Sequence, residues 1–136
     1  MISLKYTQLW VHNQDEALEF YTKKVGFEVR DDITVAEMGN FRWLAVGPVS
    51  QPDVNIVLMD IPGVPIMDDE TNKAVHELTA KGFSGTVFLV SDNLEKDYQE
   101  LEARGVEFIE KPTQRPYGLD CAFRDPSGNH LRIAQL

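Results

Sequence analysis

The hydrophobic and polar positions of this chain follow the same order twice, 79 residues apart (90 minus 11). In each copy a short apolar run leads into an Asn or Asp, and a stretch with apolar residues at helical spacing then closes on a glycine. An Asn or Asp side chain caps a helix by accepting from its first free N–H groups, and glycine readily adopts the left-handed conformation that ends one. The matched positions are Val11 with Val90, Asn13 with Asp92, Gly26 with Gly105, and Glu28 with Glu107. The chain therefore consists of two related halves.

Each half predicts a strand, a helix, a second strand and about two further strands. Strands are predicted after the two glycines, over 27–30 and 106–109, and then over 41–46, 54–59, 119–124 and 129–135. The apolar faces of the two helices consist of Ala17, Leu18, Tyr21 and Val25 in the first half and of Leu94, Tyr98 and Leu101 in the second. The pattern predicts an α+β protein.

The halves are joined by a connector rich in turn residues, over 60–69. An extra helix is predicted over 70–81, with Ala74 and Leu78 facing inward and Gly82 at its end. A chain of 136 residues is long enough for one domain with a sizeable core. We therefore predict a single domain over 1–136, with module 1 at about 1–60, the connector and extra helix at about 61–83, and module 2 at about 84–136.

The net charge of −9 changes the picture of possible partners. An acidic surface is repelled by nucleic acid phosphates and by anionic lipid headgroups, and the 13 Lys and Arg residues form no basic stripe. No apolar run approaches the roughly 20 residues that span a bilayer. We expect neither a nucleic acid nor a membrane as a partner, whereas a cationic ligand would be attracted. Surface carboxylates that serve solubility are the simpler explanation of the acidity.

The start of the chain shows no basic segment followed by a long apolar stretch, which a secretory signal would require. A single cysteine, Cys121, excludes an internal disulfide and is typical of a reducing compartment. We therefore expect a cytoplasmic location.

Two motifs at opposite ends of the chain resemble those of a known superfamily. The run 11–29 resembles the opening motif of glyoxalase, bleomycin-resistance and extradiol-dioxygenase proteins, in which Ala-x-x-Phe-Tyr and a Gly-Phe pair follow a capped valine strand. The run 123–133 resembles the closing signature, Asp-Pro-x-Gly-Asn before a last strand. The likeness to this vicinal oxygen chelate superfamily covers essentially the whole chain. It implies two tandem βαβββ modules forming a curled mixed sheet around a cavity, with helices outside, usually in a homodimer.

The Asp-Pro-Ser-Gly-Asn segment has a physical explanation independent of the family. Proline presets φ for a turn, glycine supplies a positive φ, and Asp and Asn side chains bond back to the local backbone. We assign Asp125, Gly128 and Asn129 a structural role.

Enzymes of this superfamily bind a divalent metal through His, Glu or Gln side chains on four strands, and the resemblance locates these positions. The first lies five residues before Val11, at Tyr6, and its counterpart 79 residues on is Gly85. The last lies seven residues after Asp125, at Arg132, and its counterpart falls near Val57. None of the four is a plausible ligand, and the permanent cation of Arg132 would repel a metal ion. We predict no metal and no cofactor.

The remaining chemical side chains are three histidines and one cysteine. His12 is expected at an exposed strand end, and His76 on the solvated face of the extra helix. His130 shares strand parity with Arg132 and could face the cavity, where a new metal site with Asp120 or Gln8 would be possible but has no support from spacing. Cys121 has no activating histidine at a recognisable spacing and is expected to be a small buried residue.

The ligand-binding residues that we predict follow from strand alternation together with the resemblance. Because the family's first ligand position points inward, Tyr6 should line the cavity, and alternation places Gln8 and Trp10 beside it. Arg132 should face inward by the same argument, paired with a ligand carboxylate or, in an empty cavity, with Asp120. The complete predicted set is Tyr6, Gln8, Trp10, Trp43, Tyr117 and Arg132, with Phe41 as a further candidate.

Three functions follow as hypotheses. The first is a metal-independent small-molecule-binding protein of the glyoxalase/bleomycin-resistance type, which sequesters a toxic or antibiotic compound in its aromatic cavity. The alternative is a glyoxalase-like lyase or isomerase, or a dioxygenase-related enzyme, with a non-standard site. In that enzyme His130 would act as base, Arg132 as electrostatic stabiliser and Tyr6 as a further catalytic residue. The third is a subunit-like or sensory module with a vestigial cavity. Fold alone does not decide between them.

Overall fold

The repeated strand and helix order is present in the structure, a computed structural model that describes all residues from 1 to 136. The first half contains β1 (Tyr6–Val11), α1 (Gln14–Glu19), the π-helical η1 (Phe20–Val25), β2 (Glu28–Val35), the short 3-10 helix η2 (Ala36–Met38), β3 (Phe41–Gly47) and β4 (Asn55–Asp60). The connector carries α2 (Asp69–Ala80). The second half contains β5 (Thr86–Val90), α3 (Leu94–Ala103), β6 (Phe108–Arg115), β7 (Gly118–Arg124) and β8 (His130–Gln135).

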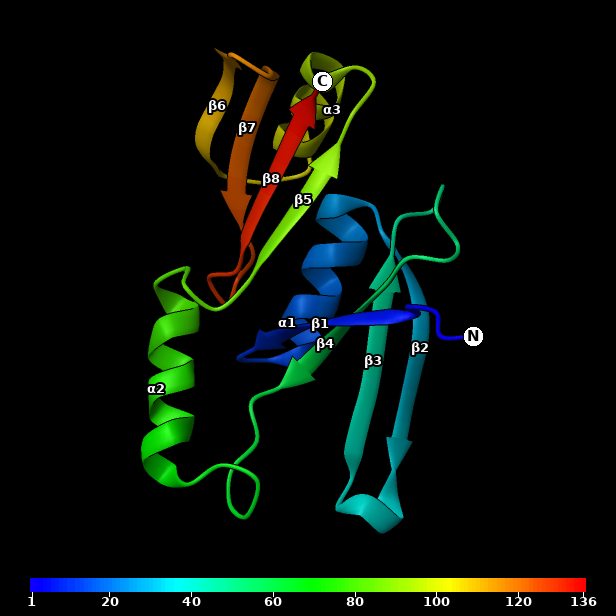
Figure 1. The fold of residues 1–136 in the computed structure, drawn as a ribbon, viewed down its shortest axis with the longest axis vertical. Helices are drawn as coiled ribbons and strands as arrows, with labels where there is room; N and C mark the ends of the chain where they lie inside the picture. The colour runs from blue at the N-terminus through cyan, green and yellow to red at the C-terminus, as the bar shows by residue number, and fades with distance from the viewer.

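The strands form two four-stranded mixed sheets with the same topology (Figure 1). Sheet A has the order β1-β4-β3-β2 and sheet B the order β5-β8-β7-β6. In each sheet the first strand pairs in parallel with the last strand of its module, and the other neighbours are antiparallel. The predicted α+β class and the two βαβββ modules are therefore confirmed. Within one chain the strands form two separate sheets rather than one closed barrel.

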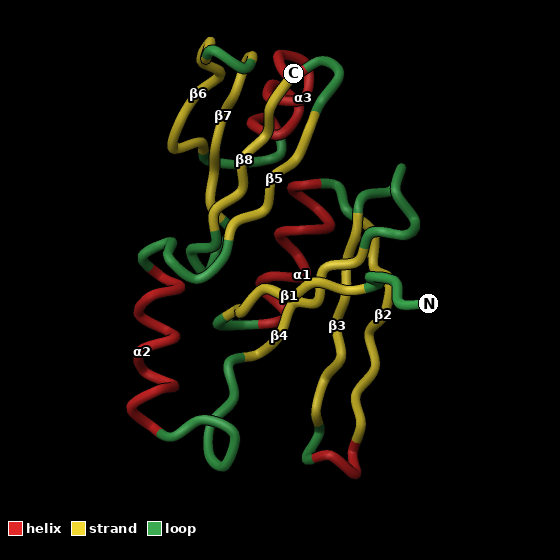
Figure 2. The backbone as a smooth tube through the Cα atoms, in the orientation of Figure 1, coloured by secondary structure: helices red, strands yellow, loops and turns green.

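One continuous hydrophobic core joins the two modules. Its 16 buried residues come from both halves. The α1–η1 segment lies between the two sheets (Figure 2). From this segment the Phe20 ring lies 6.2 Å from the ring of Phe123 on β7, and the Tyr21 hydroxyl donates a hydrogen bond of 2.7 Å to Asp125. The first helix of module 1 is thus packed against the last hairpin of module 2.

The helix caps are as predicted in the first half and differ by one residue in the second. Asn13 accepts a hydrogen bond of 2.9 Å from the backbone N–H of Glu16. In the second half the cap is Asn93, which accepts from the N–H of Lys96, so the prediction of Asp92 is wrong. Asp92 and Asn93 are adjacent in sequence and both are favourable N-cap residues. The backbone conformation places Asn93, and not Asp92, at the cap position. Each helical segment ends at a glycine with positive φ, 92° at Gly26 and 98° at Gly105.

The extra helix α2 begins and ends within one residue of the prediction, but its inward face is different. Leu78 is 49% exposed and Ala74 is also exposed, whereas Thr79 is fully buried, so the predicted inward face is wrong. The cause is a close backbone approach, because a Cβ atom on Gly128 would lie only 2.2 Å from the carbonyl oxygen of Thr79. Thr79 therefore faces the turn of module 2. No helix of the chain is long and apolar enough to cross a membrane.

Candidate ligand-binding site

Sheet A presents an open face that carries four of the predicted site residues. Strand alternation directs Leu9 and Val11 of β1 into the core and leaves Tyr6, Gln8 and Trp10 on the opposite face. The strand register adds side chains from the other three strands to this face, because residues paired across strands share a face. These are Asn55, Val57 and Met59 of β4, Phe41, Trp43 and Ala45 of β3, and Asp31, Ile33 and Val35 of β2. Tyr6, Gln8, Trp10 and Trp43 therefore lie on one surface.

A polar and aromatic cluster closes over the middle of this face. The Tyr6 hydroxyl donates a hydrogen bond of 2.8 Å to Oδ2 of Asp31, and Trp43 Nε1 donates one of 3.3 Å to the same oxygen. The rings of Tyr6 and Trp43 meet edge to face, with centroids 5.1 Å apart and planes at 80°. Tyr6 on β1 reaches Asp31 on β2 across two strands, over the short side chains of Val57 and Ala45.

A recess of about 430 Å³ adjoins the cluster at the end of β1, β3 and β4. Gln8, Trp10 and Phe41 line it together with Met59, and Met38, Pro62 and Ile66 add further apolar walls. Its base is fixed by Gln14, whose amide donates to the carbonyl oxygens of Arg42 and Leu58 at 3.2 and 2.9 Å. Asn40, Arg42 and Asp60 add polar and charged groups to the lining. A recess that combines aromatic walls with such groups is suited to a flat or amphipathic organic molecule.

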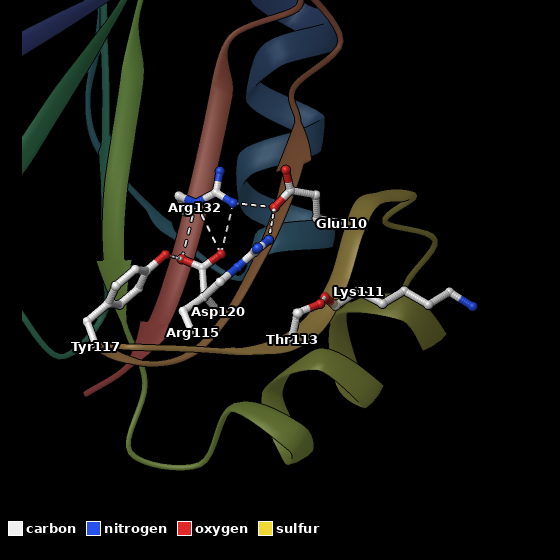
Figure 3. Close-up of polar contacts among 7 residues, drawn as sticks. All are labelled: Glu110, Lys111, Thr113, Arg115, Tyr117, Asp120 and Arg132. Atoms are coloured by element: carbon white, nitrogen blue, oxygen red, sulfur yellow. Dashed lines mark hydrogen bonds and ion pairs between the residues drawn. The ribbon is translucent and has the colours of Figure 1, made fainter.

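Sheet B carries the other predicted residues in a network of ion pairs (Figure 3). Arg132 Nε lies 3.1 Å from both carboxylate oxygens of Asp120, and its Nη2 is bonded to Asp120 at 2.9 Å and to Glu110. Arg115 adds a hydrogen bond of 3.1 Å to Glu110, and the Tyr117 hydroxyl donates one of 3.1 Å to Asp120. The network therefore holds two cations and two carboxylates in mutual contact.

The guanidinium of Arg132 is already satisfied within the chain. The hydrogen bonds and the charge of Asp120 raise the pKa of Arg132 above its ordinary value. Asp120 is only 1% exposed, so its carboxylate depends on this partner. The pairing of Arg132 with Asp120 that the sequence predicted is thus observed, and a ligand carboxylate would have to compete with two internal ones.

The predicted residues fall into two groups on different sheets. Tyr6, Gln8, Trp10 and Trp43 lie on sheet A, whereas Arg132 lies on sheet B and Tyr117 in the turn that leads into it. No hydrogen bond, ion pair or ring contact joins the two groups. One chain alone therefore does not unite the predicted residues in a single pocket.

The positions that would hold the metal of related enzymes do not fit one. Tyr6 is bonded to Asp31, Val57 is apolar, Gly85 has no side chain, and Arg132 brings a positive charge. No three His, Cys, Asp or Glu side chains lie together in a way that could hold a metal ion.

The three histidines differ in their surroundings. His12 is exposed as expected, but His76 is half-buried, so its predicted place on the solvated face of α2 is wrong. The rings of His12 and His76 are stacked with centroids 5.0 Å apart, because α2 packs its inward face against the end of β1. His130 opens β8, and its Nε2 is buried without a hydrogen-bond partner.

Cys121 is expected to react slowly with alkylating reagents while the protein is folded. Its side chain is fully buried, and burial raises the pKa of the thiol to about 11. Because only the thiolate reacts, iodoacetamide labelling at pH 8 should be at least about tenfold slower than in urea-unfolded protein, and should accelerate as the pH approaches 11. Mass spectrometry of labelling time courses measures both rates. Equal rates in the folded and unfolded states would contradict the buried placement.

Three charged residues of the two clusters were missed by the sequence reasoning: Asp31, Glu110 and Arg115. A signal for two of them was present, because the 79-residue offset that relates the halves also relates Asp31 to Glu110 (31 plus 79 equals 110). Each of the two acids is paired in register with an alanine, Ala45 or Ala122. The acidic position is therefore a repeated feature of the modules.

Comparison with known proteins places this geometry in a family. The crystal structure of UcmS2 matches with a TM-score of 0.90 at 40% identity, over 100% of this chain and 99% of that one. TnmS3, an antibiotic binding protein from Streptomyces sp. CB03234, matches with a TM-score of 0.73 at 27% identity, over 99% of this chain and 96% of that one.

The sequence comparisons agree with the structural ones. The protein YurT of Bacillus subtilis (strain 168) is 33% identical over 129 residues, which cover 95% of this chain and 95% of YurT. The sequence model of the Glyoxalase/Bleomycin resistance protein/Dioxygenase superfamily matches residues 3–133, essentially the whole chain. With its two βαβββ modules and their open faces, the chain belongs to this superfamily.

Proposed function

We propose that this protein binds a small organic molecule without a metal ion and thereby sequesters a toxic or antibiotic compound. The observation that carries the proposal is the recess of about 430 Å³ on sheet A, where Trp10 and Phe41 provide aromatic surface and Gln8 a polar group. The similarity to TnmS3, which is described as an antibiotic binding protein, supports the same class of ligand.

Sequestration requires affinity and no chemistry. Aromatic rings contribute large contact areas at a small cost in conformational entropy, and Met38 and Met59 adapt to irregular ligand shapes. The Gln8 side chain is exposed and lines the recess, so it is free to orient a ligand. Binding of this kind protects a cell in proportion to the number of protein molecules.

We further propose a homodimer in the cytoplasm. A second copy placed with its sheet B over sheet A would bring Arg132 and Tyr117 of the partner to the recess and would complete the predicted site. The exposed apolar side chains of β5, with Phe88 78% and Val90 75% exposed, support such a contact. The single cysteine supports the reducing compartment.

The lyase or isomerase alternative draws on one observation, the unpartnered and buried Nε2 of His130 near Arg132 on β8. As an electrostatic stabiliser Arg132 would first have to be released from Asp120 and Glu110. Recovery of the bound ligand separates the two functions. A sequestering protein returns it chemically unchanged, whereas an enzyme returns a product whose formation stops in a His130→Ala variant.

The test is a thermal-shift screen of an antibiotic panel in the presence of EDTA, followed by calorimetric titration of each stabilising compound. We expect the Trp10→Ala variant to bind about 20-fold more weakly, the equivalent of roughly 2 kcal/mol. Phe83→Ala is the matched control, because Phe83 is an exposed aromatic residue outside the recess, and it should bind like the unmodified protein. Equal losses in both variants, or none in either, would contradict the proposed site.

A further inference from the structure

The two modules place an acidic side chain at the same position of their sheets. Asp31 lies on β2 opposite Ala45, and Glu110 lies on β6 opposite Ala122. In both modules the small alanine lets a side chain from a strand beyond it reach the acid. Tyr6 reaches Asp31 in this way, and Arg132 reaches Glu110. The two acids are thus structural counterparts with different partners.

The partners differ in charge. Glu110 is bonded to the guanidinium groups of Arg132 and Arg115, so its charge is compensated within the chain. Asp31 takes part in no ion pair, and its two donors, Tyr6 and Trp43, are both neutral. Both donors bond to Oδ2, which leaves Oδ1 of Asp31 without a hydrogen bond. The carboxylate of module 1 therefore lacks the cation that its counterpart has.

The cations near Asp31 do not supply the missing charge. Arg30 lies in the bulge of β2 next to Asp31, but its guanidinium is bonded to Glu28 and to the carbonyl oxygens of Pro48 and Gln51. Arg42 alternates to the other face of sheet A, where it pairs with Asp15 and Asp32. Lys5 precedes β1, and its Nζ lies 5.4 Å from the centre of the Tyr6 ring. That distance is typical of a cation–π contact. The contact indicates that the face of the Tyr6 ring attracts an ammonium group.

We propose that Asp31 is the recognition residue for a positively charged group, a protonated amine or a guanidinium, on an organic ligand. The cation would bond to Oδ1 of Asp31 and lie against the rings of Tyr6 and Trp43. The ligand cation would compensate the charge of Asp31 in module 1, as Arg132 compensates the charge of Glu110 in module 2. This inference rests on the proposed function, because it names the ligand class of the same open face.

The surroundings of Asp31 define the rest of that ligand. Apart from Glu28, which forms an ion pair with Arg30 at the start of β2, Asp31 is the only charged residue among the side chains that sheet A directs to its open face. Ile33 and Val57 near it are apolar. Asp31 is only half-buried, so a ligand can reach it. A charge-assisted hydrogen bond beside aromatic rings selects an amphipathic cation with an aromatic body. The net charge of −9 attracts such a molecule over a longer range.

The experiment compares two probes of the same shape, naphthylmethylamine and naphthylmethanol, of which only the amine is charged at pH 7. Calorimetric titrations give their dissociation constants for the unmodified protein and for two variants. Asp31→Asn keeps an acceptor oxygen for Tyr6 and Trp43 but removes the negative charge. Asp32→Asn is the matched control, because Asp32 lies on the opposite face and pairs with Arg42.

We expect the amine to bind at least about tenfold more tightly than the alcohol, and Asp31→Asn to abolish that difference while Asp32→Asn preserves it. The indole N–H resonance of Trp43 should shift with the amine in the unmodified protein. Equal binding of both probes, binding of neither, or a preference that persists in Asp31→Asn would overturn the inference. A loss of dimer in Asp31→Asn with unchanged amine affinity would assign the carboxylate to a subunit contact and also overturn it. The proposed function is judged separately, by the antibiotic screen.

Discussion

Replacing Asp125 with alanine will lower the free energy of unfolding by about 4 kcal/mol, because buried donors lose their acceptor. The carboxylate accepts hydrogen bonds from the Tyr21 hydroxyl at 2.7 Å, from the backbone N–H groups of Ser127 and Asn129 at 2.9 Å, and from Asn129 Nδ2 at 3.0 Å. Tyr21 belongs to module 1 and the other donors to module 2, so the variant weakens both the turn and the contact between modules. Urea denaturation followed by circular dichroism measures the change.

Asp92→Ala is the control for this variant. Asp92 is exposed and stands one residue before the helix cap Asn93, so its loss should change stability by less than about 0.5 kcal/mol. Burial raises the pKa of Asp125, because the desolvation of its carboxylate outweighs the hydrogen bonds from Asn129, Tyr21 and Ser127 that favour the charged form. A loss below about 1 kcal/mol in Asp125→Ala would contradict the structural role of the turn.

Truncating Arg132 to alanine will lower the free energy of unfolding by about 3 kcal/mol, because it leaves the buried Asp120 without its cation. Only the Tyr117 hydroxyl would remain as a side-chain donor to that carboxylate. The Arg132 side chain is 20% exposed and that of Asp120 2% exposed, so water cannot replace the lost partner fully. Denaturant unfolding at pH 7 gives the magnitude.

Two further variants make this prediction specific. Arg115→Ala removes a cation from the same network, but its side chain is 38% exposed and its partner Glu110 is 40% exposed, so it should cost at most about 1 kcal/mol. The double variant Arg132→Met/Asp120→Ala should be more stable than the single variant Arg132→Ala. It removes the buried carboxylate of Asp120 together with its cation, whereas Arg132→Ala leaves that carboxylate unpaired. A double variant less stable than Arg132→Ala would refute this explanation.

The elements with strong local signals could be predicted from the sequence. The glycines at 26, 82 and 105 and the cap at Asn13 specify backbone conformations that few other residues adopt, and each is present in the structure. The predicted ends of two strands were wrong: β2 and β6 continue to Val35 and Arg115, well beyond the predicted 27–30 and 106–109. Long-range pairing with β3 and β7 extends these strands, and a local pattern does not contain it.

The face of α2 and the division into two sheets depended on tertiary packing. Helical periodicity offered Ala74 and Leu78 as an apolar pair, but the close approach of Thr79 to Gly128 places a different face of the helix, with Thr79 buried, against the turn of module 2. The alternation of apolar and polar residues along a strand also does not specify which strands pair at the edges of a sheet. The two modules therefore form two separate four-stranded sheets, a division that the sequence pattern did not specify.

Only those residues of the candidate site that follow from the alternation of side chains along a strand could be predicted from the sequence. Alternation along β1 placed Tyr6, Gln8 and Trp10 on one face, where the structure has them. Asp31 was missed because its role arises from Tyr6 crossing two strands, a contact between residues 25 positions apart in sequence. The contrast between Asp31 and Glu110, which suggests a cationic ligand, is visible only when the hydrogen-bond partners of both are known.

Native mass spectrometry of chelator-treated protein with a compound from the antibiotic screen distinguishes metal-independent from metal-dependent binding. We expect a saturable complex whose mass equals that of the protein plus the intact ligand, with no divalent ion, and we expect no increase in the amount of complex when nickel, zinc, iron or manganese is added. A complex that forms only when one of these ions is added and bound would contradict metal-independent binding.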